Sequence, residues 1–129
     1  MKELFQLAAE LQDFFKRQEW DFCFIGGLAL QRWGEPRLTV DIDVTLLTGF
    51  GEEEKFIDEL LMFYKGRVED IKKFAVANRV LLLQSGGDIG MDIALGGLPF
   101  ERKMVDRATP FQFLPEVKLR TCSAEDLII

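Results

Sequence analysis

Residues 38–47, Leu-Thr-Val-Asp-Ile-Asp-Val-Thr-Leu-Leu, decide the fold of this chain. Apolar and polar side chains alternate along them, and this period of two is typical of a β-strand with one buried face. Asp41 and Asp43 both stand on the polar side of the predicted strand. In an apolar setting two carboxylates so close together repel each other strongly, so a bound cation is the simplest way to keep both ionised.

A third carboxylate belongs to the same predicted site. Val80–Leu83 and residues 90–95 are separated by the turn Ser85-Gly86-Gly87 and predict a β-hairpin. Its return strand places Asp92 between the small residues Gly90 and Ala94, which leaves space beside the carboxylate. Mg²⁺, or Mn²⁺ in its place, prefers oxygen ligands and is usually held by carboxylates together with substrate phosphates. We therefore predict that Asp41, Asp43 and Asp92 bind metal, and that two ions at this site would activate an acceptor hydroxyl and stabilise a leaving pyrophosphate.

A short apolar run upstream ends in two glycines. Phe22–Ile25 predicts a buried strand, and Gly26-Gly27 lies directly before a short predicted helix at residues 28–33. Free backbone N–H groups and the helix dipole at such a turn can receive an anion, because no Cβ blocks its approach. Gly26 and Gly27 are therefore candidate phosphate-binding residues.

The remaining elements complete a fold of strands interleaved with helices. Leu4, Leu7, Leu11, Phe14 and Phe15 have the spacing of one face of an amphipathic helix. The acidic run at residues 52–54 begins a second helix, whose predicted buried face holds Phe56, Ile57, Leu60, Leu61 and Phe63. Further predictions are an ambiguous helical segment at 69–77, strands at 111–113 and 117–122, and a helix start at 123–126. The order of elements indicates an α/β or α+β sandwich with a mixed sheet.

Composition limits the class of protein. With 129 residues, 48% of them hydrophobic and twelve of them Phe, the chain is expected to form one soluble domain with a Phe-rich core. The absence of histidine removes Ser/His and Cys/His nucleophile pairs. A net charge of −6 argues against indiscriminate coating of nucleic acid. Cys23 and Cys122 lack the spacing of a zinc site and are expected to be reduced core thiols.

No apolar run approaches the roughly 20 residues of a membrane-spanning helix, and the N-terminus lacks the features of a signal peptide. We therefore expect a cytoplasmic protein without a membrane partner.

The site residues resemble a known superfamily. Ile25-Gly26-Gly27-Leu28-Ala29-Leu30, followed by Gly34, Arg37, Thr39 and Asp41-Ile42-Asp43-Val44, resembles the GG/GS…DxD signature of the polymerase-β-like nucleotidyltransferases. Within that superfamily the chain is most similar to the AbiEii-toxin-like and minimal nucleotidyltransferase groups. Met91-Asp92-Ile93-Ala94, followed by Leu98-Pro99-Phe100-Glu101, resembles the later strand that carries their third Asp.

The resemblance, which spans roughly residues 22–128, implies a nucleotidyltransferase fold, a mixed β-sheet flanked by helices. It implies that Asp41 and Asp43 bind the metals, that Asp92 helps to deprotonate the acceptor, and that Gly26 and Gly27 hold the triphosphate, with Arg37 a further candidate for a phosphate contact. The activity implied is transfer of a nucleoside monophosphate from a nucleoside triphosphate to a hydroxyl of an RNA or protein acceptor, in a toxin–antitoxin system. Relatives continue past Leu127 into a helical region, so residues 1–129 are expected to be a single domain that lacks it.

Two alternatives remain open. The first is a catalytically incomplete domain of the same fold that acts as a binding module through a protein partner, and an exposed apolar patch near Phe111 and Phe113 would support it. The second is a haloacid-dehalogenase-like phosphatase, because residues 41–45 also match a DxDxT nucleophile motif. That family requires a doubly wound parallel sheet. Basic side chains able to meet RNA phosphate are Lys65, Arg67, Lys72, Lys73, Arg79, Arg102, Lys103 and Arg107.

Overall fold

The computed structural model describes residues 2–34 and 40–127. Its helices are α1 (Lys2–Arg17), α2 (Gly26–Arg32), α3 (Glu53–Leu61), α4 (Ile71–Asn78), α5 (Pro99–Arg107) and the 3₁₀ turn η1 (Glu125–Leu127). Its strands are β1 (Phe22–Ile25), β2 (Ile42–Leu47), β3 (Lys65–Gly66), β4 (Val80–Gln84), β5 (Gly90–Gly96), β6 (Thr109–Leu114) and β7 (Val117–Thr121). Among the described helices none is long and apolar enough to cross a membrane.

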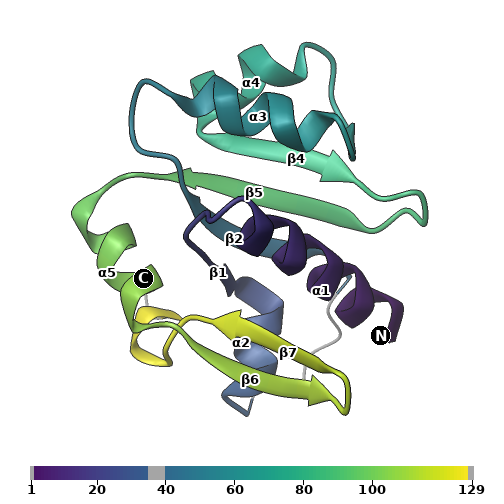
Figure 1. The fold of residues 1–129 in the computed structure, drawn as a ribbon, viewed down its shortest axis with the longest axis vertical. Coiled ribbons are helices and arrows are strands. Elements are labelled where there is room, and N and C mark those ends of the chain that lie inside the picture. The colour runs from purple at the N-terminus through teal and green to yellow at the C-terminus, as the bar shows by residue number, and fades with distance from the viewer. Residues whose placement is uncertain (1, 35–39, 128–129) are drawn as a thin grey trace.

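One mixed sheet organises the described residues, with its seven strands in the order β3-β4-β5-β2-β1-β7-β6. Central β2 runs parallel to β5 and antiparallel to β1. Figure 1 shows α3 and α4 together beside β4, at the end of the molecule opposite β6 and β7. The predicted mixed sheet with flanking helices is confirmed, and the phosphatase alternative is wrong because this sheet is not a doubly wound parallel one.

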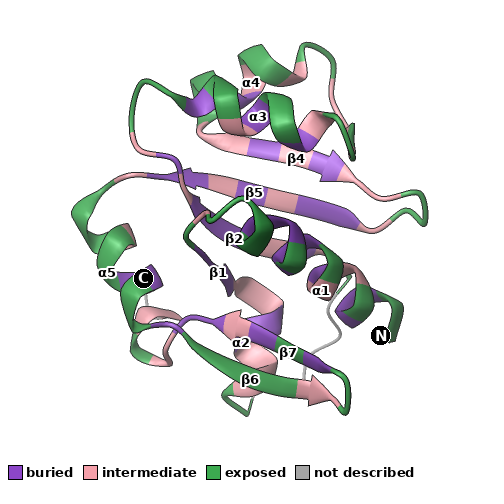
Figure 2. Cartoon of the chain, in the orientation of Figure 1, coloured by how far each residue is buried: buried purple, intermediate pink, exposed green. Residues whose placement is uncertain are grey.

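The main core lies on one face of the sheet, where α1, α3 and α4 pack against alternate strand residues. Phe24, Val44 and Ile93 are fully buried on this face together with Leu11 of α1 and Ile57 of α3. In Figure 2, β5 accordingly alternates between buried and intermediate residues over much of its length. The half-buried positions of β5, among them Asp92, therefore belong to the opposite face.

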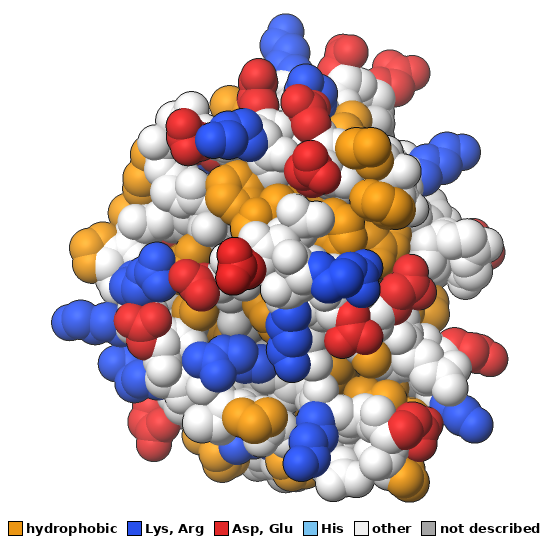
Figure 3. Space-filling model, in the orientation of Figure 1, with side chains coloured by type: hydrophobic (Ala, Val, Ile, Leu, Met, Phe, Trp, Pro, Cys, Tyr) orange, Lys and Arg blue, Asp and Glu red, His pale blue; other side chains and the backbone are white. Residues whose placement is uncertain are grey.

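A smaller cluster on the opposite face holds α2 and α5 against β1. Its buried members are Cys23, Ala29, Met104, Val105, Ala108 and Cys122. Both cysteines are buried and free, as the sequence predicts. This second layer covers only part of the face, so the carboxylates of β2 and β5 are not sealed in. Figure 3 shows acidic and basic side chains side by side on the outer surface.

Three predicted boundaries are wrong. The helix predicted for residues 28–33 begins at Gly26, so both glycines belong to its first turn and do not precede it. The strand predicted for residues 38–47 begins only at Ile42, so Asp41 precedes it, and Val40, expected on the buried side, is 64% exposed. Leu38 and Thr39 lie outside the described residues. Phe63, expected on the buried face of the second helix, follows the end of α3 and is 64% exposed, because the helix stops before its next inward turn.

Two elements were not predicted. The mixed-charge segment after Leu98 forms α5, which begins with Pro99 and a capping bond in which the backbone N–H of Leu98 donates to Glu101 Oε1 at 2.9 Å. Strand β3 consists of two residues only, and no hydrophobic pattern marks so short a segment. Both elements contribute to the surroundings of the carboxylates described next.

Candidate active site

Strands β2 and β5 place two of the predicted carboxylates side by side. Asp43 and Asp92 are register partners in the parallel β2–β5 pair, so their side chains project from adjacent positions on the same face of the sheet. Both residues are half-buried. The structure thus brings together two aspartates that lie 49 positions apart in the sequence.

Asp41 joins them through a backbone contact. It lies immediately before β2, and its Oδ1 accepts a hydrogen bond from the backbone N–H of Gly90 at 3.2 Å. Because Gly90 begins β5, this bond ties the approach to β2 to the strand that carries Asp92. All three predicted carboxylates therefore lie at one end of the β2–β5 pair.

The start of α2 closes the site on the other side. Gly26 has a φ of +61°, and a Cβ added to it would lie 2.5 Å from Oδ2 of Asp43. The position therefore requires glycine both for its backbone conformation and for the close approach of the carboxylate. Gly27 lies within the first turn of α2, and no side chain caps the N-terminus of this helix. Arg37, the third predicted phosphate-binding residue, lies outside the described residues.

Hydrogen bonds from the end of α2 hold the helix in this position. Arg32 Nη1 donates to Thr121 Oγ1 at 2.9 Å, and Trp33 Nε1 donates to the carbonyl of Cys122 at 3.0 Å. Both acceptors lie on or directly after β7. The two glycines are thus fixed relative to Asp43 by contacts at the far end of their own helix.

Arg67 also belongs to the site, although the sequence placed it only among the basic side chains able to meet RNA. It follows β3, and its guanidinium Nη2 donates to Oδ1 of Asp92 in an ion pair. The backbone N–H of Arg67 donates to the carbonyl of Leu82 at 2.9 Å, and Leu82 is in turn the register partner of Asp92. No sequence signal connects Arg67 with Asp92, because the pairing depends on the unpredicted strand β3.

The electrostatics of this cluster are unfavourable for Asp43. Burial, followed by the negative charges of Asp92 and Asp41, raises the pKa of Asp43 to about 6, and Arg67 offsets part of this effect. Desolvation and like charges both disfavour an ionised carboxylate. A cation bound here would offset the repulsion between Asp43 and its neighbours Asp92 and Asp41.

The chemistry of the three carboxylates fits a hard divalent cation, since all the donors are oxygens and their charges are only partly compensated. In the described residues, however, no three Asp, Glu or Cys side chains already have the geometry to hold a metal ion. Two of the three carboxylates already have other partners. Asp92 is bonded to Arg67, and Asp41 is bonded to the backbone of Gly90.

A hollow of about 440 Å³ adjoins the carboxylates along the same face of the sheet. Its floor includes Thr45 and Ala94, the register pair next to Asp43 and Asp92 on that face. Gly26 and Phe100 also line it, and most of its lining is apolar. The volume lies within the range of about 300–1,000 Å³ found for small-molecule sites.

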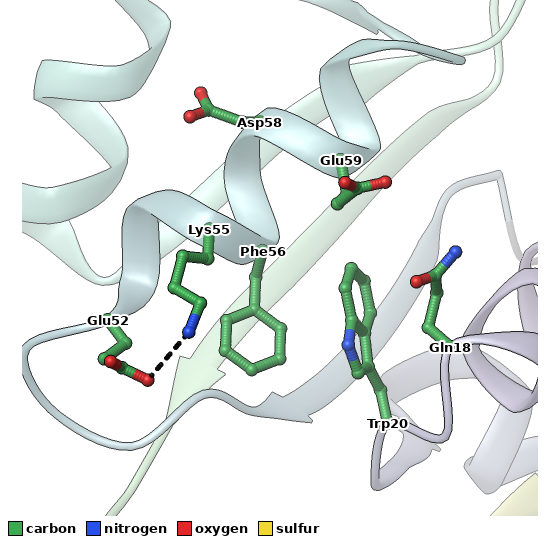
Figure 4. Close-up of a pocket in the computed structure, with 7 residues that line it drawn as sticks. All are labelled: Gln18, Trp20, Glu52, Lys55, Phe56, Asp58 and Glu59. Atoms are coloured by element: carbon green, nitrogen blue, oxygen red, sulfur yellow. Dashed lines mark hydrogen bonds and ion pairs between the residues drawn. The ribbon is translucent and has the colours of Figure 1, made fainter.

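A second hollow, of about 520 Å³, lies apart from the carboxylates, between α3 and the segment that follows α1. The rings of Trp20 and Phe56 lie against each other there at an angle of 51°, with centroids 4.7 Å apart, and Lys55 pairs with Glu52 at the rim (Figure 4). None of the residues that line this hollow is a predicted site residue. The hollow that belongs to the candidate active site is therefore the one of about 440 Å³ beside Thr45 and Ala94.

Comparison with known proteins identifies a family. Residues 7–129 match the family model described as "Nucleotidyl transferase AbiEii toxin, Type IV TA system". No curated protein matches the chain. The matched range includes the three carboxylates, both glycines and Arg67.

Proposed function

Because the chain belongs to the AbiEii family of nucleotidyl transferase toxins of type IV toxin–antitoxin systems, we propose that it is a metal-dependent nucleotidyltransferase. It transfers a nucleoside monophosphate from a nucleoside triphosphate to a hydroxyl of an RNA or protein acceptor. The register pairing of Asp43 with Asp92, beside Asp41 and the backbone of Gly26, is the observation that carries this proposal. A cytoplasmic location stays a prediction of the sequence.

Each site residue has a role in this reaction. Asp41, Asp43 and Asp92 would hold Mg²⁺ or Mn²⁺, which would supply charge stabilisation to the transferring phosphoryl group and to the leaving pyrophosphate. Asp92 accepts the proton of the attacking hydroxyl. As the bond from the acceptor oxygen to the α-phosphorus forms, the bond from that phosphorus to the bridging oxygen breaks, and pyrophosphate leaves.

The start of α2 and the adjoining hollow accommodate the nucleotide. The first-turn N–H groups of α2, including that of Gly27, have no side-chain cap, and such groups are suitable donors to phosphate oxygens. The hollow beside Thr45 and Ala94 has room for a planar base, and in this proposal it receives the nucleoside. Both features lie next to Asp43, so a single nucleotide can reach them and the metal together.

Isothermal titration of ATP, GTP, CTP and UTP in the presence of Mg²⁺ tests the binding half of the proposal. We expect the wild type to bind at least one triphosphate in a Mg²⁺-dependent manner and the Asp41→Asn/Asp43→Asn variant to lose this binding. Asp13→Asn, which removes an exposed carboxylate of α1, is the matched control and should bind normally. Absence of Mg²⁺-dependent binding to any triphosphate would contradict the proposal.

Label transfer tests the catalytic half. A triphosphate labelled at the α-phosphate should pass its label to an acceptor in total RNA or protein, whereas one labelled at the γ-phosphate should not, because the latter leaves with pyrophosphate. Digestion of the labelled product with ribonuclease or protease identifies the acceptor class. Transfer of the γ-label would instead identify a kinase.

A second candidate function is that of a binding module which acts through a protein partner. It is favoured by the ion pair between Arg67 and Asp92, which engages the predicted catalytic carboxylate. Phe111, on the edge strand β6, is 37% exposed and offers apolar surface to a partner, for which the family suggests an antitoxin protein. Light scattering after gel filtration separates the candidates, since a monomer at high concentration with full turnover would exclude a purely scaffolding role.

A further inference from the structure

We propose that Arg67 is the built-in counter-ion of the metal-free site and that its guanidinium leaves Asp92 when a divalent cation binds. The inference rests on the proposed function, because it takes Asp92 to be a metal ligand. It adds to that function a positioning residue, Arg67, whose place on Asp92 determines how readily the site accepts metal.

The register of three strands brings Arg67 to Asp92. Residues Gly66 and Leu83 are partners in the β3–β4 pair, and Leu82 and Asp92 are partners in the β4–β5 pair. Arg67, one residue beyond Gly66, is held in line with this row by its backbone bond to Leu82. Its side chain extends over β4 and reaches Oδ1 of Asp92.

The guanidinium occupies space that glycine leaves open at position 90. A Cβ added to Gly90 would clash with Nη1 of Arg67 and would lie 3.0 Å from Oδ1 of Asp41. Arg67 thus lies within a short distance of two of the three carboxylate residues. Its side chain is only 24% exposed and that of Asp92 34%, so solvent screens the ion pair only in part.

Metal and guanidinium compete for the same charge. Arg67 already donates to Oδ1 of Asp92, and a divalent cation on that oxygen would stand beside a second positive charge. The bond to Arg67 also occupies Oδ1 of Asp92, one of the oxygens that the proposed ligand set needs. The free energy of metal binding should therefore include the cost of displacing Arg67. Removing the guanidinium should increase the affinity for metal.

The test is a Mn²⁺ titration followed by electron paramagnetic resonance, which detects free Mn²⁺ and requires no turnover. Arg67→Met should bind Mn²⁺ roughly fivefold to tenfold more tightly than the wild type, as expected for the loss of one competing charged hydrogen bond. Its unfolding temperature without metal should fall, and Mn²⁺ should raise that temperature by more than it does in the wild type. Arg79→Met removes a comparably buried pair, Arg79 with Glu53 at 2.6 Å, and should leave Mn²⁺ affinity unchanged.

Gly90→Ala provides a second variant that keeps every charge. The new methyl group should push the flexible end of Arg67 away from Asp92. It also approaches Oδ1 of Asp41, so Mn²⁺ affinity should again rise, but by less than in Arg67→Met. Affinity that is unchanged in both variants, or lower in Arg67→Met, would overturn the inference, because Arg67 would then be neutral or helpful to metal binding.

The outcomes also separate this inference from the proposed function. If the wild type binds Mn²⁺ through Asp41 and Asp43 and Arg67→Met binds it with equal affinity, the counter-ion role of Arg67 is wrong and the proposed function stands. If neither the wild type nor any variant binds Mn²⁺, both the counter-ion role and the proposed function are wrong. Binding that appears only when Arg67 is replaced would support the inference most strongly.

Discussion

Asp43 is the residue whose charge is least well tolerated in the candidate active site. Its pKa of about 6 lies above the value of about 3.9 for an aspartate in an unfolded chain. The folded state therefore takes up a proton more readily than the unfolded state. The resulting stability is fully present below about pH 4 and is lost as the pH rises through about 6.

Asp43→Asn should therefore stabilise the metal-free protein at neutral and alkaline pH. We expect an increase in unfolding free energy of about 1–2 kcal/mol at pH 8, allowing for solvent screening of a half-buried group, and roughly half that gain at pH 5. Thermal unfolding followed by circular dichroism in EDTA measures both values. Asp13→Asn is the control, and a gain independent of pH would show that the charge of Asp43 is not the cause.

Arg67 shows the limit of sequence-based prediction at the scale of residues. The sequence predicted Asp41, Asp43 and Asp92 as site residues because the alternation placed each on the less apolar side of an expected strand, and Gly26 because a paired glycine follows an apolar run. Arg67 stands in no such pattern. Its contact with Asp92 is made by a side chain that crosses β4, and local sequence does not determine how far a side chain reaches across a sheet.

Glycine at the start of α2 is required for two separable reasons. Gly26 and Gly49 both have positive φ, +61° and +71°, but only at Gly26 would an added Cβ meet a neighbour within 4 Å, namely Asp43. A substitution at Gly49 therefore measures backbone strain alone. A substitution at Gly26 adds the clash with the carboxylate.

Gly49→Ala should lower the unfolding free energy by about 1–2 kcal/mol, the cost of a left-handed alanine. Gly26→Ala should cost about 1–3 kcal/mol more, as overpacking does. Urea unfolding of both variants measures the difference. Most of the excess should disappear when Gly26→Ala is combined with Asp43→Ala, and an excess that persists would place the clash elsewhere than the carboxylate.

At the scale of elements, long periodic segments were predicted and short or irregular ones were not. The amphipathic spacing of α1 and the hairpin of β4 with β5 are both confirmed. α5 was missed because its mixed charges hide a buried face that contains only Met104 and Val105. The start predicted for β2 was too early. The alternation of apolar and polar residues extends back to Val40, but no neighbouring element buries the side chain of Val40.

The whole molecule assembles its site from the order of strands in the sheet. The sequence predicted a mixed sheet and a neighbouring strand for Asp92, but not that β5 pairs in parallel with β2 while β1 pairs antiparallel on its other side. This order depends on long-range packing and brings Gly26, Asp43, Asp92 and Arg67 into one line. The fold class could be predicted from local sequence patterns. Which residues lie side by side in the candidate site could be read only from the three-dimensional structure.

The distribution of charge over the molecule bears on its acceptor. Eight basic residues were candidates for contacts with RNA phosphate, and five of them form ion pairs with carboxylates. These pairs are Arg67 with Asp92, Lys72 with Asp58, Arg79 with Glu53, Arg102 with Asp21, and Arg107 with Asp126. With a net charge of −6 besides, little positive charge is left for a nucleic acid backbone.

We therefore expect no general affinity for RNA, since binding without sequence preference depends on neutralising several phosphates. A labelled, unstructured RNA of about 20 nucleotides should show no binding below about 100 μM at about 150 mM salt, the weak end of the range for non-specific binders. Fluorescence anisotropy at several salt concentrations measures this. Micromolar binding that weakens steeply with salt would contradict the expectation and reveal a basic surface.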